Sequence, residues 1–154
     1  MRIRHTGCLI ALMAAAFLQA QVAVQHLQPN QSALIADGVW AGDTLYLSGQ
    51  LPDPVTPGKY GDTKVQAFSV LTKIQKLLKA QGLDMKDVVK MTVFLAGDPD
   101  KGGKLDFAGL QESYTRFFGT KEQPNKPARS AMQVAALVVP WALVEIEVIA
   151  VRSK

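Results

Sequence analysis

Three segments of the chain alternate apolar and polar residues with a period of two, as half-buried β-strands do. They span residues 22–27, 127–134 and 143–151. Residues 44–48 are rich in β-branched and aromatic side chains and follow a Gly-Asp turn signal, so they predict a further strand. Residues 88–95 are almost continuously apolar, which favours a strand in the middle of a sheet.

Two segments have the three- to four-residue spacing of amphipathic helices instead. Asp62 is a good N-cap for the first, which Gly82 ends. Asp106 caps the second, which ends at Gly119. The apolar residues predicted to line one face of the second helix are Phe107, Leu110, Tyr114 and Phe117.

The order strand, strand, helix, strand, helix, strand, strand predicts an α/β protein of the α+β type. One mixed sheet would carry two helices on a single face. No repeat or linker interrupts residues 21–154, so we expect them to form a single domain. The other face of the sheet must then be covered by something else.

The N-terminal residues predict an export signal. A short basic start is followed by an apolar run from Cys8 to Leu18 and by small residues near Ala20. That run is too short to span a bilayer, so residues 1–20 are interpreted as a signal peptide, with the cleavage site placed to within a few residues. We expect an exported protein, periplasmic or secreted, whose mature form is not in a membrane. Cleavage would also remove the sole cysteine.

Composition gives little support to nucleic acid, metal or nucleotide binding. The net charge of +4 includes two arginines of the predicted signal, and the remaining lysines are scattered. His26 has no partner at metal-ligand spacing, and Gly102-Gly103 lacks the setting of a phosphate loop. We therefore expect no metal, no cofactor and no nucleic-acid partner.

Arg129 is the residue whose chemistry best suits a small anionic ligand. By alternation it shares its face with Ala131 and Gln133, and we expect this to be the helix-free face. A guanidinium can grip a carboxylate with two parallel hydrogen bonds. An ion pair with Glu145 or Glu147 on a neighbouring strand is the open alternative.

Glu145 and Glu147 alternate with valines and isoleucine, so both should point away from the helices. A carboxylate there could activate a water molecule. Solvated strand residues would have the same pattern.

Five ordered motifs resemble the RidA (YjgF/Yer-type) family of imine deaminases, over nearly all of residues 21–154. They are Leu-Tyr-Leu-Ser-Gly-Gln-Leu-Pro (45–52), Val-Lys-Met-Thr-Val-Phe-Leu (89–95), Tyr-Thr-Arg-Phe-Phe (114–118), Pro-Ala-Arg-Ser (127–130) and Val-Glu-Ile-Glu-Val-Ile-Ala (144–150). The resemblance implies a chorismate-mutase-like fold and a homotrimer. The sheets would close into a barrel, with three sites in the clefts between subunits.

The resemblance also implies the roles of individual residues. Arg129 would hold the carboxylate of a 2-imino acid, such as the one formed from 2-aminoacrylate. Ser48 would hydrogen-bond the substrate, while Glu145 and the backbone carbonyl of Ala131 would orient the attacking water. The products would be a 2-keto acid and ammonia.

Two positions depart from the family pattern. Leu34-Ile35-Ala36 replaces a Gly-Pro-Tyr segment whose tyrosine closes the pocket, which predicts a more apolar pocket here. Gln111 stands where the family commonly has an asparagine, and we expect it to contact the substrate. The sequence thus favours an enamine/imine deaminase. The alternative is a trimer of the same fold that binds small carboxylates without turnover.

Overall fold

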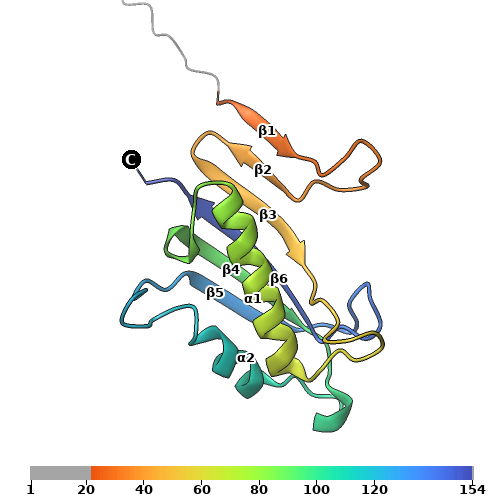
Figure 1. Ribbon diagram of the computed structural model, residues 1–154. Helices are drawn as coiled ribbons and strands as arrows, with labels where there is room; N and C mark the ends of the chain where they lie inside the picture. Colours follow the sequence, from red (N-terminus) through yellow and green to blue (C-terminus); the bar gives the residue numbers. More distant parts are fainter. Residues whose placement is uncertain (1–21, 154) are drawn as a thin grey trace, which may run out of the picture.

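The computed structural model describes residues 22–153, and the predicted signal peptide lies outside this range. Six strands form one sheet in the order β1-β2-β3-β6-β4-β5 (Figure 1). All neighbouring strands are antiparallel except β4 and β5, which are parallel. The sheet is therefore mixed, as expected. The strands are β1 (Val24–Leu27), β2 (Gly38–Ala41), β3 (Thr44–Gln50), β4 (Val88–Leu95), β5 (Ala128–Gln133) and β6 (Val144–Val151).

Helices α1 (Thr63–Ala80) and α2 (Phe107–Tyr114) cover one face of this sheet (Figure 1). Two short 3-10 turns, η1 (Met85–Asp87) and η2 (Pro99–Lys101), flank β4. The core lies between the helices and the sheet. Its largest fully buried side chains include Phe118, Leu45, Leu71, Ile74, Met91 and Ile146. The predicted α+β fold with two helices on a single face is confirmed.

The predicted N-caps of both helices are confirmed, whereas α2 ends at Tyr114 and not at Gly119. The Asp62 side chain accepts a hydrogen bond from the Val65 amide at 2.9 Å. Asp106 accepts from the Gly109 amide at 3.0 Å. Each carboxylate satisfies an amide that the first helical turn leaves without a partner. Asp106 thus fixes where α2 begins.

The N-terminal part of the sheet differs from the prediction in two respects. Strand β2 was not predicted, because its four residues show no clear alternation; it pairs with β3 through the turn at Gly42. The first strand begins at Val24, and both Val22 and Val24 are exposed. It is an edge strand in which only Leu27 is partly buried against the core, so it is more exposed than the half-buried strand expected.

The second face of the sheet has no helix over it. On β6, Val144, Ile146 and Val148 are buried beneath the helices while Glu147 is exposed on the other side. Tyr46 of β3 is exposed as well. The prediction that Glu145 and Glu147 point away from the helices is confirmed, and within this chain that face stays bare.

Two kinds of feature are absent from residues 22–153. No described helix has the length and apolar character needed to cross a membrane. No three of the histidine, cysteine, aspartate and glutamate side chains in this range are grouped closely enough to hold a metal ion.

Candidate functional site

Strand β5 carries Arg129 at the outer edge of the sheet. Its parallel pairing with β4 sets Arg129 opposite Met91, whose side chain is fully buried under the helices. Paired residues project to the same face, so Arg129 points toward the helices. The expectation that it lies on the helix-free face was wrong: alternation shows which residues share a face, but not which face that is.

Helix α2 presents a stripe of three side chains to Arg129. Phe107, Gln111 and Tyr114 follow one another at spacings of four and three, which aligns them on one side of a helix. The Arg129 Cζ atom lies 4.2 Å from the centre of the Tyr114 ring and 5.6 Å from that of Phe107. The guanidinium therefore rests on aromatic rings, an arrangement that is favourable for a cation.

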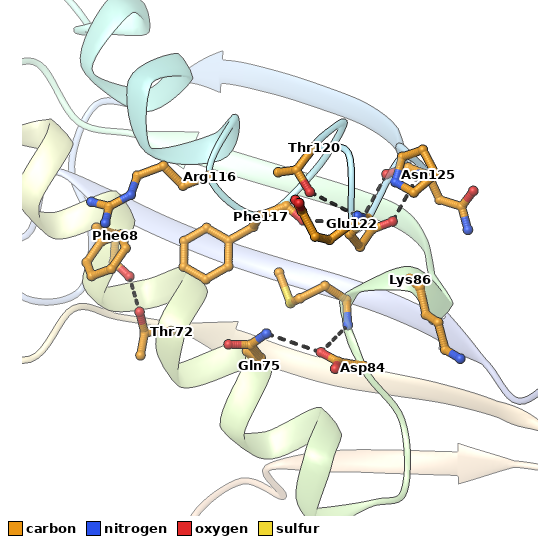
Figure 2. Close-up of a pocket in the computed structure, with 13 residues that line it drawn as sticks. Phe68, Thr72, Gln75, Asp84, Lys86, Arg116, Phe117, Thr120, Glu122 and Asn125 are labelled. Atoms are coloured by element: carbon orange, nitrogen blue, oxygen red, sulfur yellow. Dashed lines mark hydrogen bonds between the residues drawn. The ribbon is translucent and has the colours of Figure 1, made fainter.

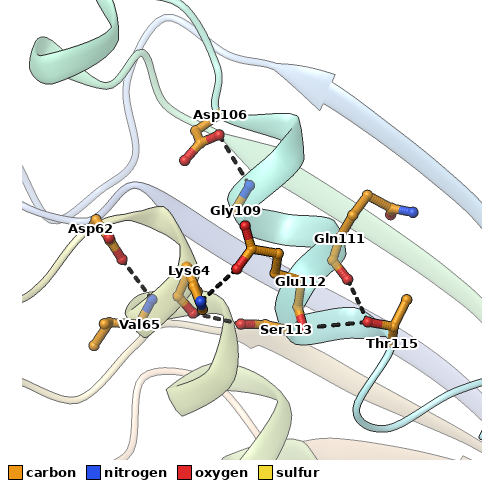
Figure 3. A network of polar contacts seen from close by, with 9 residues as sticks. All are labelled: Asp62, Lys64, Val65, Asp106, Gly109, Gln111, Glu112, Ser113 and Thr115. Atoms are coloured by element: carbon orange, nitrogen blue, oxygen red, sulfur yellow. Dashed lines mark hydrogen bonds and ion pairs between the residues drawn. The ribbon is translucent and has the colours of Figure 1, made fainter.

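A polar network between the two helices holds this stripe in place (Figure 3). Lys64 of α1 forms an ion pair with Glu112 of α2 at 2.5 Å. The Ser113 hydroxyl donates to the Lys64 carbonyl oxygen at 2.7 Å and is buried. Gln111 is directed away from this network (Figure 3). The side-chain amide of Gln111 therefore takes no part in this network.

Two buried polar atoms of this region lack a hydrogen-bond partner within residues 22–153. They are Nη1 of Arg129 and Oε1 of Gln111. A buried polar group without a partner is costly, by roughly 1–3 kcal/mol, and charged groups cost more. The pair consists of a cationic donor and a neutral acceptor. A ligand with a carboxylate and an N–H group would satisfy both.

Tyr114 stays a neutral phenol beneath the cation. Burial raises the pKa of Tyr114, and the nearby Arg129 cation opposes this by lowering it. Since the net shift is upward, the ring carries no charge near neutral pH. It therefore supports the guanidinium through its π face and does not form an ion pair that would compete with a bound carboxylate.

The ion pair considered for Arg129 is not formed. Neither glutamate of β6 lies within ion-pair distance of it in the described chain. Strand β4 separates β5 from β6, so Arg129 and Glu145 are not on neighbouring strands. The charge of Arg129 remains available to a ligand.

A second group of predicted site residues lies on the bare face. Gly49 of β3 is so close to Glu145 that a Cβ atom there would overlap the carboxylate. The preceding residue, Ser48, donates its hydroxyl proton to the Ala36 carbonyl oxygen at 2.7 Å. The hydroxyl oxygen can still accept a hydrogen bond. Ser48 and Glu145 are thus brought together on β3 and β6.

The two groups face opposite sides of one sheet. Phe94 of β4 pairs with Glu145, whereas Met91 of β4 pairs with Arg129. Residues 91 and 94 are separated by an odd number of positions, so their side chains project to opposite faces. The described chain therefore brings Arg129 together with Gln111, and Glu145 together with Ser48, but does not join the two pairs.

Ala131 and Gln133 lie on the same face as Arg129. Ala131 pairs with Val93 and is exposed. Gln133 is engaged in structure: its side chain accepts from the Leu105 amide at 2.9 Å and donates to the Gly103 carbonyl at 3.0 Å. Gln133 thus anchors the loop before α2, which leaves Ala131 as the small residue next to Arg129.

An open groove of about 720 Å³ lies elsewhere, between α1, η1 and the segment after α2 (Figure 2). There Arg116 lies over the Phe68 ring at 4.2 Å, which resembles the stacking of Arg129. Arg116 is exposed, however, and none of its atoms is buried without a partner. The groove therefore lacks the unsatisfied buried donor that Arg129 provides.

Sequence reasoning did not find Tyr114 and Phe107 as neighbours of Arg129, because it assigned both to the core. Tyr114 is indeed buried, but Phe107 is 46% exposed. Their spacing with Gln111 on one stripe of α2 was the available signal.

Comparisons with known proteins agree with this fold. A family profile described as Endoribonuclease L-PSP matches residues 20–152. The 2-iminobutanoate/2-iminopropanoate deaminase of Salmonella typhimurium is 38% identical over 116 residues, covering 75% of this chain and 84% of the relative. A RutC family protein of Pyrococcus horikoshii is 38% identical over 128 residues, covering 81% and 92%.

Solved structures give the same result. Yeast Mmf1 superposes with a TM-score of 0.64 at 30% identity, covering 87% of this chain and 98% of that protein. A YjgF family member from Neisseria meningitidis shares the fold with a TM-score of 0.68 at 21% identity, covering 88% and 99%. The predicted resemblance is confirmed, and the chain belongs to the Endoribonuclease L-PSP family, also called the RidA/YjgF family.

Proposed function

We propose that this protein hydrolyses 2-imino acids to 2-keto acids and ammonia. The observation that carries the proposal is the state of Arg129: it rests on Tyr114, and its buried Nη1 has no acceptor within the described chain. A carboxylate supplies that acceptor together with a compensating charge. The 38% identity to a relative named 2-iminobutanoate/2-iminopropanoate deaminase supports the choice of substrate.

In the proposed complex the substrate carboxylate binds the Arg129 guanidinium, and Gln111 faces the imine nitrogen. The buried Oε1 of Gln111 can accept a hydrogen bond from the imine N–H. The imine carbon is already electrophilic, so orientation of one water molecule supplies much of the rate enhancement.

Glu145 holds that water and accepts one of its protons as the oxygen attacks. The new C–O bond gives a carbinolamine, in which carbon carries both the hydroxyl and the amino group. Glu145 first gives its proton to the nitrogen, which completes that amino group. It then takes the hydroxyl proton as the C=O bond forms and passes it to the nitrogen as the C–N bond breaks, so the nitrogen leaves as ammonia. The overall change is imine plus water to keto acid plus ammonia.

This mechanism requires a second copy of the chain, and we propose that the protein is a homotrimer. Arg129 and Glu145 face opposite sides of the sheet, so one subunit would supply Arg129 and Gln111 while its neighbour supplies Ser48 and Glu145. Two features support this assembly. The second sheet face is bare, and edge strand β5 exposes Ala128, Ala131 and Met132.

A carboxylate-binding trimer without turnover is the second candidate. It is favoured by the hydrogen bond of Ser48. The Ser48 hydroxyl already donates its proton to the Ala36 carbonyl oxygen, so it has no proton to donate to a substrate. Catalysis of RNA cleavage, which the family description names, finds less support in this chain. His26, the single histidine within residues 22–153, lies on β1, at the opposite edge of the sheet from β5.

The test is the release of ammonia from 2-iminobutanoate generated in situ by an amino-acid oxidase. With the protein present, hydrolysis should exceed the rate in buffer, and Glu145→Gln should remove the excess. Titration with 2-oxobutanoate should still show binding to Glu145→Gln. Binding by the unaltered protein without any excess hydrolysis would establish the second candidate instead.

A further inference from the structure

We infer that the site prefers 2-imino acids with a large apolar side chain, branched aliphatic or aromatic, over those with a methyl or a charged group. The inference rests on the proposed deaminase function and concerns the substrate group that neither Arg129 nor Glu145 contacts. Two apolar surfaces, one beside each half of the proposed site, carry it.

The first surface is the ring of Phe107. It is the first residue of α2, its ring centre lies 5.6 Å from the Arg129 Cζ atom, and it is 46% exposed. Tyr114, which holds the guanidinium more closely, is buried. An exposed ring of this size next to an anchored carboxylate gains free energy when an apolar substituent covers it.

The second surface is formed by Leu34 and Ile35. Their side chains are 100% and 69% exposed, and they directly precede Ala36, whose carbonyl accepts the Ser48 hydroxyl proton. They therefore stand beside the half of the site that contains Glu145. In the proposed trimer, this segment of one subunit and Phe107 of the next border the same cleft.

The two acidic groups of the helix that carries Phe107, at its N-cap and in its interior, already have partners. The Asp106 carboxylate accepts from the Gly109 amide as the helix cap. The Lys64 and Glu112 side chains neutralise each other across the two helices. A charged substrate side chain would lose hydration against the two apolar surfaces and would gain no ion pair from these groups.

The experiment compares kcat/KM for imines generated from leucine, phenylalanine, alanine and glutamate. The leucine- and phenylalanine-derived imines should be hydrolysed with a kcat/KM about tenfold or more above that of the alanine-derived imine, since a few methylenes in an apolar pocket give such ratios. The glutamate-derived imine should be the poorest of the four.

Three variants test whether these two apolar surfaces cause the preference for large apolar side chains. Phe107→Ser and Ile35→Ser should each lower the leucine-to-alanine ratio severalfold, while Phe107→Leu should preserve it because the apolar surface remains. Val55→Ser is the matched control: Val55 is 58% exposed in the loop before α1, and its substitution should leave the ratio unchanged. Circular dichroism confirms that each variant is folded.

The outcomes separate this inference from the proposed function. If the alanine- or glutamate-derived imine is hydrolysed as efficiently as the leucine-derived one, the side-chain preference is wrong and the deaminase proposal stands. If no imine is accelerated, the deaminase proposal fails. The preference is then judged by titration, where 4-methyl-2-oxopentanoate should bind about tenfold more tightly than pyruvate, and equal affinities would overturn it.

Discussion

The guanidinium carbon of Arg129 lies 4.2 Å from the centre of the Tyr114 ring, so a residue of β5 and a residue of α2 together define the charged centre of the site. The ring covers a face of the guanidinium and leaves its edge for hydrogen bonds. Carboxylates bind that edge. Affinity should therefore depend on Tyr114, even though this residue has no direct role in the chemistry.

Replacing Tyr114 should test this dependence. Tyr114→Phe keeps an aromatic face and should bind 2-oxobutanoate nearly as well as the unaltered protein. Tyr114→Leu loses the cation–π contact, worth about 0.5–2 kcal/mol, so its dissociation constant should rise about 2- to 30-fold. Isothermal titration calorimetry measures both variants, and equal affinity of the Leu and Phe variants would contradict a positioning role.

Arg129→Lys should weaken carboxylate binding although the charge is kept. A lysine ammonium cannot form the two parallel hydrogen bonds of a guanidinium, and losing a charge-assisted bond costs about 1.5–3 kcal/mol, or about 10- to 150-fold in affinity. Arg116→Lys is the matched control, because Arg116 also stacks on an aromatic ring but lies in the separate groove. A comparable loss in both variants would argue against a site at Arg129.

Stability should fall at high pH in a way that depends on Tyr114. Burial raises the pKa of Tyr114 above 10.0, so above that pH the unfolded chain releases the phenol proton while the folded chain retains it. The unfolded state then binds fewer protons, and the free energy of unfolding decreases as pH rises. Urea denaturation from pH 9 to 11 should show a shallower decline for Tyr114→Phe, and an unchanged slope would contradict the raised pKa.

Gly49→Ala should separate catalysis from carboxylate binding. The added Cβ overlaps the Glu145 carboxylate and must displace it, and a displacement of about 1 Å can reduce a rate by about 100-fold. In the proposed trimer the Arg129 that holds the carboxylate belongs to the neighbouring subunit, and the added Cβ meets only Glu145, so the affinity for 2-oxobutanoate should change little.

Gly58→Ala controls for general destabilisation in that experiment. Gly58 has open space around it but a φ of 75°, so alanine strains the backbone without contacting Glu145. The hydrolysis rate should fall in Gly49→Ala only. A similar loss in both variants would indicate lost stability in place of a displaced carboxylate.

The sequence predicted those parts of the fold that are determined locally. Asp62 and Asp106 satisfy amides three residues away, so both helix starts could be read from the chain. Glu145 could be assigned to the bare face because the valines and the isoleucine that alternate with the two glutamates identify the buried side. In each case the deciding neighbours lie within a few residues.

The orientation of Arg129 could not be predicted in this way. Apart from Met132, the other β5 residues are small or polar, and Met132 is exposed on the face opposite Arg129, so hydrophobicity does not identify the buried side of this strand. The pairing of Arg129 with buried Met91 decides its direction, and this contact joins residues 38 positions apart. Its stacking on Tyr114 likewise depends on how α2 packs against the sheet, which is a tertiary property.

Mixing two inactive variants should restore activity if each site draws on two subunits. Arg129→Ala and Glu145→Ala each destroy every site of their own trimer. Co-refolded in equal amounts, they place an intact Arg129 beside an intact Glu145 in about a quarter of the sites, as random closed cyclic assembly predicts. The rate of 2-iminobutanoate hydrolysis per site should then recover to about a quarter of that of the unaltered protein.

The control for this experiment is co-refolding of Arg129→Ala with a chain that carries both substitutions. No site of that mixture contains an intact Arg129, so it should stay inactive. If the first mixture also stays inactive while native mass spectrometry shows mixed trimers, both residues must act within one subunit. That result would contradict the shared site. The shared site is proposed because Arg129 and Glu145 project to opposite faces of the same sheet and cannot meet within one subunit.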